Sequence, residues 1–286
     1  MAQRSKAYPA NAPGPFFVDS SCIDCGTCWA VAPGVFQDAG GHSLVHRQPD
    51  PGAHLRALMA LLACPTASIG TGDKAGMAEA LQAFPDPIED EVSFCGFTSE
   101  RSFGAWSYHL RREDGGVLVD SPRAAAPLME RLEAQGGVAL MVLTHADDVA
   151  DHARLRDRFG CERLMHEADG LRDLERYIVG SNPVPLAEDL LLIPTPGHTA
   201  GSVCLLYRKA FLFTGDHLWW NPDLAMLSAS RNYCWHDWKA QLRSLERLLD
   251  FDFRWVLPGH GQGFRAASPQ AMRAELERAL VRLRGL

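Results

Sequence analysis

The segment "VALMVLTHADDVADH" (residues 138–152) joins an apolar run to a cluster of acidic and imidazole side chains. The apolar run, residues 138–143, has the length and composition of a buried strand. One His and three Asp then fall within residues 145–151, and His152 follows directly. These residue types are common ligands of divalent metals, but an acidic, well-capped helix could begin in the same way. The choice depends on what the rest of the chain places beside this segment.

Length and charge limit the class of protein. The chain has 286 residues, enough for one large domain or two smaller ones. Its net charge of -7 and the lack of a basic run argue against a nucleic-acid partner. No stretch reaches the roughly 18 consecutive apolar residues of a membrane span, and residues 1–15 are polar and Pro-rich. We therefore expect a soluble cytoplasmic protein with a small-molecule substrate and no membrane partner.

Composition divides the chain into four parts. We predict a leader at residues 1–15, a Cys-containing unit at 16–72, a linker at 73–92 and a longer region at 93–286. Within the Cys-containing unit, Leu and Met recur on one face of a predicted helix over residues 53–63.

The longer region mixes strands and helices, which predicts an α+β fold. Strand-like runs lie at residues 105–112, 116–122, 138–145, 162–166, 189–197, 202–208, 210–216 and 253–259. Helical patterns lie at residues 126–135, 151–159, 238–249 and 269–286.

Four of the eight cysteines form one pattern near the N-terminus. Cys22, Cys25 and Cys28 follow the spacing C-x2-C-x2-C, and Cys64 is followed by Pro65. Three thiolates on one loop can hold three corners of a cubane cluster, and a remote Cys-Pro can hold the fourth. A zinc knuckle or four unrelated thiols are the alternatives, although zinc sites usually pair two C-x-x-C arms or include His. We predict that these four cysteines bind one [4Fe–4S] cluster.

The sequence "CIDCGTCWAVAPGVFQDAGG…LLACPTASI" resembles a single-cluster [4Fe–4S] ferredoxin of the bacterial type, over about residues 16–72. Two-cluster relatives carry a Cys-Pro where this chain has Ala32-Pro33, so the resemblance implies one cluster. It also implies a redox partner protein. The other cysteines lie in apolar or aromatic surroundings and are expected to be buried thiols: Cys95, Cys161, Cys204 and Cys234.

Three later strand ends carry His or Asp. His198 lies in "TPGHTAGS", Asp216 in "FLFTGDHLWW" and His260 in "VLPGHG". Each alone is typical of a turn. Because strand ends at one edge of a sheet converge in space, these residues and the segment 145–152 together predict a metal site.

These fragments, with the strand pair "SYHLRREDGGVLVDSP", resemble the metallo-β-lactamase superfamily over about residues 93–265. That superfamily includes glyoxalase II, lactonases, persulfide dioxygenases and flavodiiron oxygen reductases. The resemblance implies an αββα sandwich with one or two divalent metals. The family motif T-H-x-H-x-D-H is shortened here to Thr144-His145-Ala146-Asp147-Asp148. Either the second His is lost or Asp148 replaces the last His, and both alignments make Asp147 the motif Asp.

The resemblance implies a carboxylate-rich set of ligands, in which Asp216 bridges two metals. The predicted ligands, with His152 in reserve, are His145, Asp147, Asp148, His152, His198, Asp216 and His260. Carboxylates favour iron or manganese over zinc. Asp151 is interpreted as a solvated helix residue, and His166 and His217 as residues that support the site or the fold.

Three functions remain open. The first is a metal-dependent hydrolase of thioester- or lactone-type substrates, with Asp147 or Asp148 as catalytic proton carrier. The second is a redox enzyme in which the cluster feeds electrons to a di-iron site. The third is an electron carrier or sensor with a decayed lactamase-fold scaffold. The aromatic segment 227–238 either lines the pocket, with Arg231 binding a substrate anion, or packs in the core.

Overall fold

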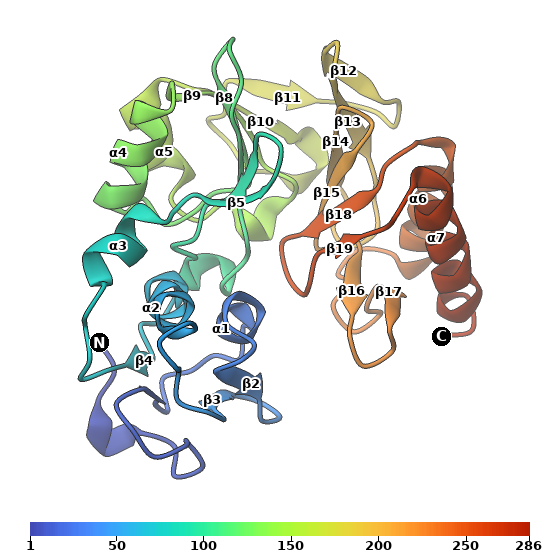
Figure 1. The fold of residues 1–286 in the computed structure, drawn as a ribbon. Coiled ribbons are helices and arrows are strands. Elements are labelled where there is room, and N and C mark those ends of the chain that lie inside the picture. The colour runs from blue at the N-terminus through green and yellow to red at the C-terminus, as the bar shows by residue number, and fades with distance from the viewer. The chain divides into compact units, whose positions relative to one another are not determined.

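The computed structural model describes residues 1–286 and separates into two compact units (Figure 1). The first unit comprises Met1–Ala139 and Ala150–Cys161, and the second comprises Leu140–Val149 and Glu162–Leu286. The first unit therefore contains the Cys motif, and the second contains six of the seven predicted metal ligands. The domain boundaries drawn from composition stay a prediction.

Short strands and two helices form the N-terminal part of the first unit. These are β1 (Phe17–Val18), α1 (Thr27–Val31), β2 (Phe36–Asp38), β3 (Ser43–Val45), α2 (His54–Ala63) and β4 (Ile69–Gly70). Strand β1 pairs antiparallel with β4, and β2 with β3. Helix α2 matches the helix predicted over residues 53–63, and it buries Leu58 and Met59 as its apolar face requires.

The predicted leader, residues 1–15, is bonded to this part of the first unit. Asn11 is central, because its side-chain oxygen accepts hydrogen bonds from the backbone N–H groups of Val18 and Val45, both 3.0 Å away. Its amide group donates to the carbonyl of Tyr8 at 2.7 Å. The sequence did not predict these contacts, because composition gives no sign of such long-range hydrogen bonds.

An antiparallel meander and three helices complete the first unit. They are α3 (Met77–Gln82), β5 (Asp86–Glu89), β6 (Val92–Phe94), β7 (Tyr108–Leu110), β8 (Gly116–Val119), α4 (Ala126–Ala134) and α5 (His152–Phe159). Strands β5 to β8 pair consecutively. Strand β5 lies inside the predicted linker and was not predicted, because its Pro and acidic residues are typical of loops.

The end of α2 is held by residues that follow β6. The Ala63 carbonyl accepts hydrogen bonds from the backbone N–H and the hydroxyl of Thr98, at 3.2 and 2.6 Å. Arg123 donates to the Leu62 carbonyl at 3.1 Å. These bonds satisfy carbonyl groups that a helix C-terminus leaves without intrahelical partners. They also join the Cys-containing part of the first unit to the meander.

The second unit contains three parallel strands, a six-stranded sheet, a hairpin and two helices. The parallel strands are β9 (Val138–Val142), β10 (Glu162–His166) and β11 (Arg176–Ile178). The six-stranded sheet runs in the order β12 (Val184–Ala187), β13 (Leu190–Pro194), β14 (Val203–Tyr207), β15 (Phe211–Gly215), β18 (Trp255–Pro258) and β19 (Phe264–Arg265). The hairpin is β16 (Trp219–Asn221) with β17 (Met226–Ser228), and the helices are α6 (Trp238–Arg247) and α7 (Pro269–Leu283).

Strands β15 and β18 are parallel neighbours in a sheet that is otherwise antiparallel. Their carboxyl ends therefore lie at the same edge of the sheet. Asp216 follows β15 and His260 follows β18, so the topology brings these two residues together.

Helices α6 and α7 lie side by side against this sheet (Figure 1). Leu206 and Val256 of the sheet belong to the same buried cluster as Leu245 of α6 and Leu276 of α7. Each such side chain contributes roughly 1.5–3 kcal/mol when fully buried. This packing fixes one face of the sheet, whose strand ends carry the site.

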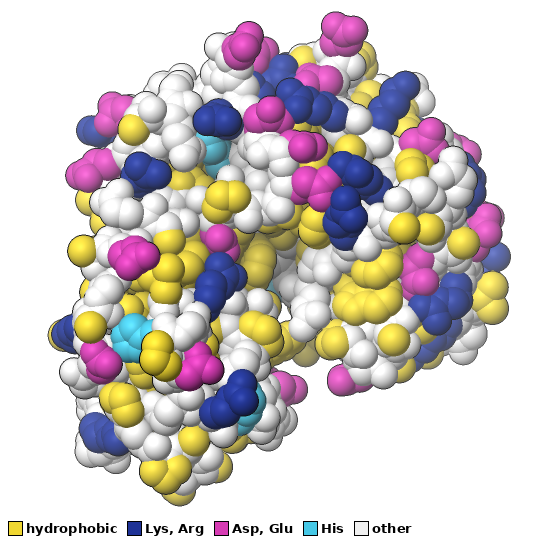
Figure 2. All heavy atoms as spheres, viewed as in Figure 1, with side chains coloured by type: hydrophobic (Ala, Val, Ile, Leu, Met, Phe, Trp, Pro, Cys, Tyr) yellow, Lys and Arg dark blue, Asp and Glu magenta, His cyan; other side chains and the backbone are white.

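Acidic and basic side chains are interspersed on the face drawn in Figure 2, with no extended patch of one sign. Among the helices, none has both the length and the apolarity needed to cross a bilayer.

Candidate metal centre and cluster site

His145 follows β9 in extended backbone and is fully buried, at 1% exposure. Its Nδ1 lies 2.9 Å from the hydroxyl of Thr144, so that nitrogen has a partner. Its Nε2 points instead toward two carboxylates, with the Oδ2 atoms of Asp148 and Asp216 each 3.8 Å away. The ring is thus oriented by Thr144 and offers Nε2 to the centre.

His198 lies in the turn after β13 and is oriented by a different loop. Its Nδ1 donates a hydrogen bond to the Tyr233 carbonyl at 2.5 Å, which leaves the Nε2 lone pair facing the centre. That Nε2 lies 3.5 Å from Asp147 Oδ2 and 3.8 Å from Asp216 Oδ2. The His198 carbonyl accepts the N–H of Trp235, which fixes the backbone as well.

Asp216 and His260 meet at the shared edge of β15 and β18. The Nδ1 of His260 lies 2.8 and 2.9 Å from the two carboxylate oxygens of Asp216. Both carboxylates also lie close to the backbone of Gly259. A Cβ at this position would lie 2.6 Å from Asp148 Oδ2 and 2.9 Å from Asp216 Oδ1. A larger residue at position 259 would push the two carboxylates apart.

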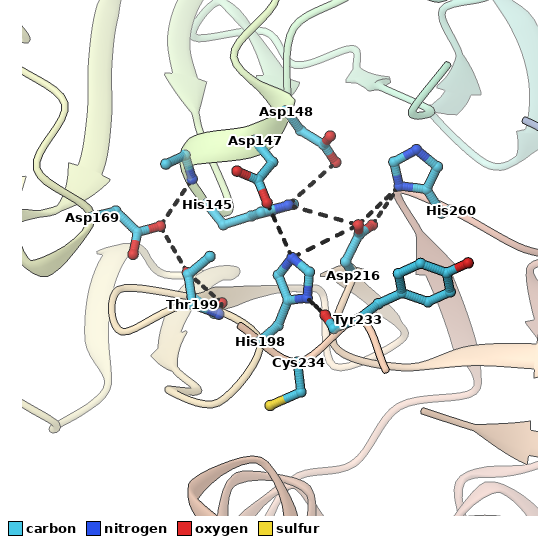
Figure 3. Close-up of polar contacts among 12 residues, drawn as sticks. His145, Asp147, Asp148, Asp169, His198, Thr199, Asp216, Tyr233, Cys234 and His260 are labelled. Carbon is cyan, nitrogen blue, oxygen red and sulfur yellow. Dashed lines mark hydrogen bonds and ion pairs between the residues drawn. The ribbon is translucent and has the colours of Figure 1, made fainter. Parts of the chain in front are cut away.

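Two groups of side chains each bring three ligand atoms within 4.8 Å of one another. His145, Asp147 and His198 form one group, and His145, Asp148 and Asp216 form the other. Figure 3 shows these side chains pointing toward one another, with His260 beside Asp216. The arrangement has the donor types and spacing that one or two divalent cations need.

The charges of the centre also suit a cation. Burial lowers the pKa of His145, which favours the neutral ring that ligates metals. Burial by itself would raise the pKa of Asp216, but His260, His145 and His198 outweigh it and hold that pKa well below its usual range. The neighbouring His198 ring, with its Nε2 3.5 Å from the carboxylate, lowers the pKa of Asp147. The carboxylates are therefore ionised beside a neutral His145 ring, while Asp147 and Asp216 raise the pKa of His198 despite its burial.

Two buried nitrogens test the fit of a metal directly. The Nε2 atoms of His145 and His198 are shielded from solvent and have no hydrogen-bond partner. Buried polar atoms in native proteins nearly always have partners, so an orphaned pair requires an explanation. A cation bound between them supplies that explanation, and the residues present fit one.

Most of the predicted ligands come together, and one lies elsewhere in the chain. The six that meet within the second unit are His145, Asp147, Asp148, His198, Asp216 and His260. His152 begins α5 in the first unit, so its place in the ligand set stays a prediction. Asp151 is not the solvated residue expected from the sequence, because its side chain is only 10% exposed and accepts the Ala124 N–H.

Two further histidines, which the sequence analysis interpreted as supporting residues, belong to neither group of ligands. His166 lies 2.9 Å from the Gly180 carbonyl and accepts the N–H of Ala168. His217 is fully buried, and burial lowers its pKa to about 3. The His166 ring is thus held by hydrogen bonds, whereas both ring nitrogens of the buried His217 have no hydrogen-bond partner.

The aromatic segment after β17 is partly exposed. Tyr233 and Trp235 are 65% and 62% exposed, so an aromatic core loop is the wrong description of these two side chains. Arg231 donates to the Leu286 carbonyl at 2.5 Å.

Three of the four cysteines outside the cluster motif are buried as predicted: Cys95, Cys161 and Cys204. Cys234 is only partly buried, and it donates to the Gly197 carbonyl at 3.0 Å.

Sequence reasoning missed two residues beside the centre. Asp169 accepts hydrogen bonds from both loops that carry His145 and His198, and Thr199 is one of its donors. The second is Tyr233, whose backbone carbonyl accepts the hydrogen bond from His198 Nδ1. Sequence patterns do not reveal such a role, because every residue has a backbone carbonyl. Asp169 lies three residues after His166, the last residue of β10, and this position near a strand end was its only signal in the sequence.

The four predicted cluster ligands line one cavity in the first unit: Cys22, Cys25, Cys28 and Cys64. The backbone N–H groups of Ser43 and Ser68 point at two of the sulfurs, at 3.4 Å from Cys22 Sγ and 3.3 Å from Cys64 Sγ. Such N–H groups stabilise thiolate bound to iron. Burial raises the pKa of Cys25 to about 11, so a bound cation is needed to keep it deprotonated.

Comparison with known proteins agrees with both folds. Residues 18–71 match a protein-family model described as the 4Fe–4S single cluster domain of ferredoxin I. The alignment with the structure of DIM-1 metallo-β-lactamase covers 68% of this chain and 95% of the DIM-1 chain, with 16% identity and a TM-score of 0.52. VMB-1 covers the same shares at 16% identity, with a TM-score of 0.50. A single-cluster [4Fe–4S] ferredoxin domain precedes a metallo-β-lactamase fold in this chain.

Curated relatives of the lactamase-fold region are hydroxyacylglutathione hydrolases. The Rhizobium etli protein is 30% identical over 125 residues, which are 38% of this chain and 49% of that protein. The Acidiphilium cryptum protein is 35% identical over 136 residues, 44% of this chain and 56% of that protein. The chain thus spans about half the length of the curated relatives it matches.

Proposed function

We propose that the protein is a metal-dependent hydrolase of thioester- or lactone-type substrates, and that its centre holds one or two divalent metals. The observation that carries the proposal is the buried pair of unpartnered Nε2 atoms, on His145 and His198, facing ionised carboxylates. The similarity to hydroxyacylglutathione hydrolases supports the substrate class, because an acylglutathione is a thioester.

A divalent metal in such a centre supplies an acidified water and a positive charge for the developing oxyanion. The chain's own residues hold the ligands and move the proton. Of the two candidate proton carriers, Asp147 is half exposed, whereas Asp148 is buried at 1%. Asp147 can therefore exchange a proton with solvent, and we assign it that role. Asp148 then serves as a ligand.

Carboxylate-rich coordination guides the choice of metal. Three carboxylates and three imidazoles face the centre, from Asp147, Asp148, Asp216, His145, His198 and His260. Hard oxygen donors favour iron or manganese relative to an imidazole-rich zinc site. This composition keeps a second candidate function open, in which the [4Fe–4S] cluster feeds electrons to a di-iron site.

The first test counts metals and measures hydrolysis on the same preparation. Anaerobically purified protein should contain about four iron atoms for the cluster plus one or two further metals per chain. It should hydrolyse acylglutathione or lactone substrates. Asp216→Asn should lose the further metal and at least 100-fold in kcat/KM while keeping cluster iron, because it removes the charge shared by three imidazoles.

The exposed Asp223, also in the second unit, provides a matched control. Asp223→Asn makes the same chemical change away from the centre and should leave both metal content and turnover unchanged. Cluster iron alone in the wild-type protein would contradict the enzyme proposal. Iron well above the cluster content, without hydrolysis, would instead favour the redox enzyme.

A further inference from the structure

Asp169 connects the two loops that carry His145 and His198. It closes the short 3-10 turn Glu167–Asp169 after β10. Its Oδ2 accepts the backbone N–H of Ala146 at 2.9 Å and the hydroxyl of Thr199 at 2.8 Å. Its Oδ1 accepts the backbone N–H of Gly201 at 2.5 Å. Figure 3 shows the Asp169 carboxylate beside Thr199, on the far side of the two loops from Asp216.

The bonded groups are immediate neighbours of the candidate ligands. Ala146 follows His145, and Thr199 follows His198, so each contact fixes a peptide next to an imidazole. A second hydrogen bond holds the residue before His145. The Thr144 carbonyl accepts the Val203 N–H at 2.9 Å. The residue before His145 is therefore bonded to β14, and the residue after it is bonded to Asp169.

Gly201 allows the carboxylate to come this close. A Cβ at position 201 would lie 2.6 Å from Asp169 Oδ1 and 2.7 Å from its backbone nitrogen. Such a separation is too short for any real Cβ, so the loop and the carboxylate fit together only with glycine at this position.

We propose that Asp169 is a positioning residue that clasps the His145 and His198 loops and so preorganises the metal centre. This inference rests on the proposed metal centre, but not on the identity of the substrate. A carboxylate that accepts two N–H groups and one hydroxyl makes charge-assisted hydrogen bonds, which are shorter and stronger than neutral ones. Holding both rings in place before a metal arrives reduces the ordering that metal binding must otherwise provide.

The test measures zinc affinity by chelator competition, on full-length protein with its cluster intact and its second metal removed. Asp169→Asn keeps the shape of the side chain but turns one acceptor into a donor facing an N–H group. Residues that support metal ligands typically contribute 10–100-fold to metal affinity, so the variant should bind zinc about 10–100-fold more weakly. Glu167→Gln alters an exposed carboxylate two residues away and should bind zinc like the wild type.

A second readout separates positioning from general stability. Hydrogen exchange of the Ala146 and Gly201 amides in the metal-free protein should speed up in Asp169→Asn, while amides of α7 stay protected. If Asp169→Asn does not fold, Thr199→Val removes a single donor to Asp169 and should weaken zinc binding by a smaller factor, in the same direction.

Three results decide the inference. Unchanged zinc affinity in a folded Asp169→Asn protein would overturn it, and so would a wild-type protein that binds no zinc. Weaker zinc binding in Asp169→Asn but not in Glu167→Gln supports it. A wild-type protein that binds zinc but hydrolyses no thioester or lactone would refute only the proposed function, since the clasp is judged by affinity.

Discussion

Three imidazoles converge on the carboxylate of Asp216. His260 bonds to both of its oxygens, and His145 and His198 each approach Oδ2 to 3.8 Å. His260 above all, with its hydrogen bonds, and the two other imidazoles hold the pKa of Asp216 low despite its burial. Asp216 therefore stays ionised, and it belongs to the group with His145 and Asp148 while its Oδ2 also lies 3.8 Å from His198 Nε2.

Gly104 limits the packing around the cluster site in the first unit. A Cβ there would lie 2.6 Å from Cys25 Cβ and 2.8 Å from Cys25 Sγ, and the Gly104 carbonyl accepts the Thr27 hydroxyl. Gly104→Ala should displace Cys25 and cost most of the cluster iron. Iron content and the visible absorption of the cluster measure this loss.

The control for that experiment is Gly40→Ala, which isolates backbone strain from contact. Gly40 has a φ of +78° and Gly104 a φ of +84°, but a Cβ at Gly40 meets nothing within 4 Å. Both substitutions should cost about 1–2 kcal/mol from the left-handed backbone. Equal iron retention in the two variants would refute the role assigned to the Gly104 contact.

At the scale of elements, β10 and β11 are joined by a buried arginine. Arg163 of β10, 6% exposed, donates through Nε to Glu175 Oε2 at 2.9 Å, and its backbone N–H reaches the same oxygen. The hydrogen bonds from Arg163 lower the pKa of Glu175 to about 2. This pair positions β10, the strand that leads to Asp169.

The lowered pKa of Glu175 gives a pH-dependent stability. A carboxyl whose pKa is lower in the folded state stabilises the fold above its ordinary pKa of 4.5 and loses that effect as pH falls toward 2. Glu175→Gln should therefore lower Tm by about 2 °C at pH 7, with a difference that shrinks between pH 4.5 and 2. Scanning calorimetry across this range measures it.

Glu162→Gln is the matched control for this pH series. Glu162 forms a longer contact with Arg176, at 4.0 Å on the surface. Exposed pairs of this kind contribute little, so its Tm should stay within about 1 °C of the wild type. A constant Tm difference for Glu175→Gln at every pH would contradict the linkage argument.

The elements also explain which strands were predictable. Strands β13, β14 and β15 are almost wholly buried, and their apolar runs were visible in the sequence. Strand β5 was hidden because Pro87 and its acidic neighbours are typical of loops, yet it pairs with β6 at the edge of the meander.

At the scale of the whole molecule, the chain combines a [4Fe–4S] ferredoxin domain with a metallo-β-lactamase fold. The variant Cys25→Ser distinguishes a hydrolase with an accessory cluster from a redox enzyme that needs the cluster. For a hydrolase with an accessory cluster, the variant should lose cluster iron but keep its second-site metal and its kcat/KM within about threefold, because hydrolysis moves no electrons.

A redox enzyme predicts the opposite result for the same variant. Turnover would then disappear with the cluster, because electrons could no longer reach the second site. Cys161→Ser, which makes the same change at a buried thiol of the first unit that does not line the cluster cavity, serves as the control, and its cluster iron should remain near the wild-type level. Iron analysis and steady-state kinetics on the same samples separate the two cases.

Much of both sites was predictable because their signals are local. Cys22, Cys25 and Cys28 follow one another at three-residue spacing, and this spacing together with the remote Cys64-Pro65 indicates a cluster. His198 and Asp216 each follow an apolar strand closely, and the convergence of strand ends is a general property of sheets. The role of Asp148 could not be fixed, because the shortened motif aligns in two ways and only one of them makes Asp148 a replacement for the last His.

The sequence by itself indicated a cluster motif and a set of metal-type ligands, because both signals depend on residues near one another in the chain or at strand ends. Only the tertiary structure decided how they are grouped: Asp147 with His198, Asp148 with His145, and Asp169 across both loops. The contacts of Asp169 join residues 23 to 32 positions apart. Such pairings depend on how the loops pack, and no periodicity or spacing in the sequence records them.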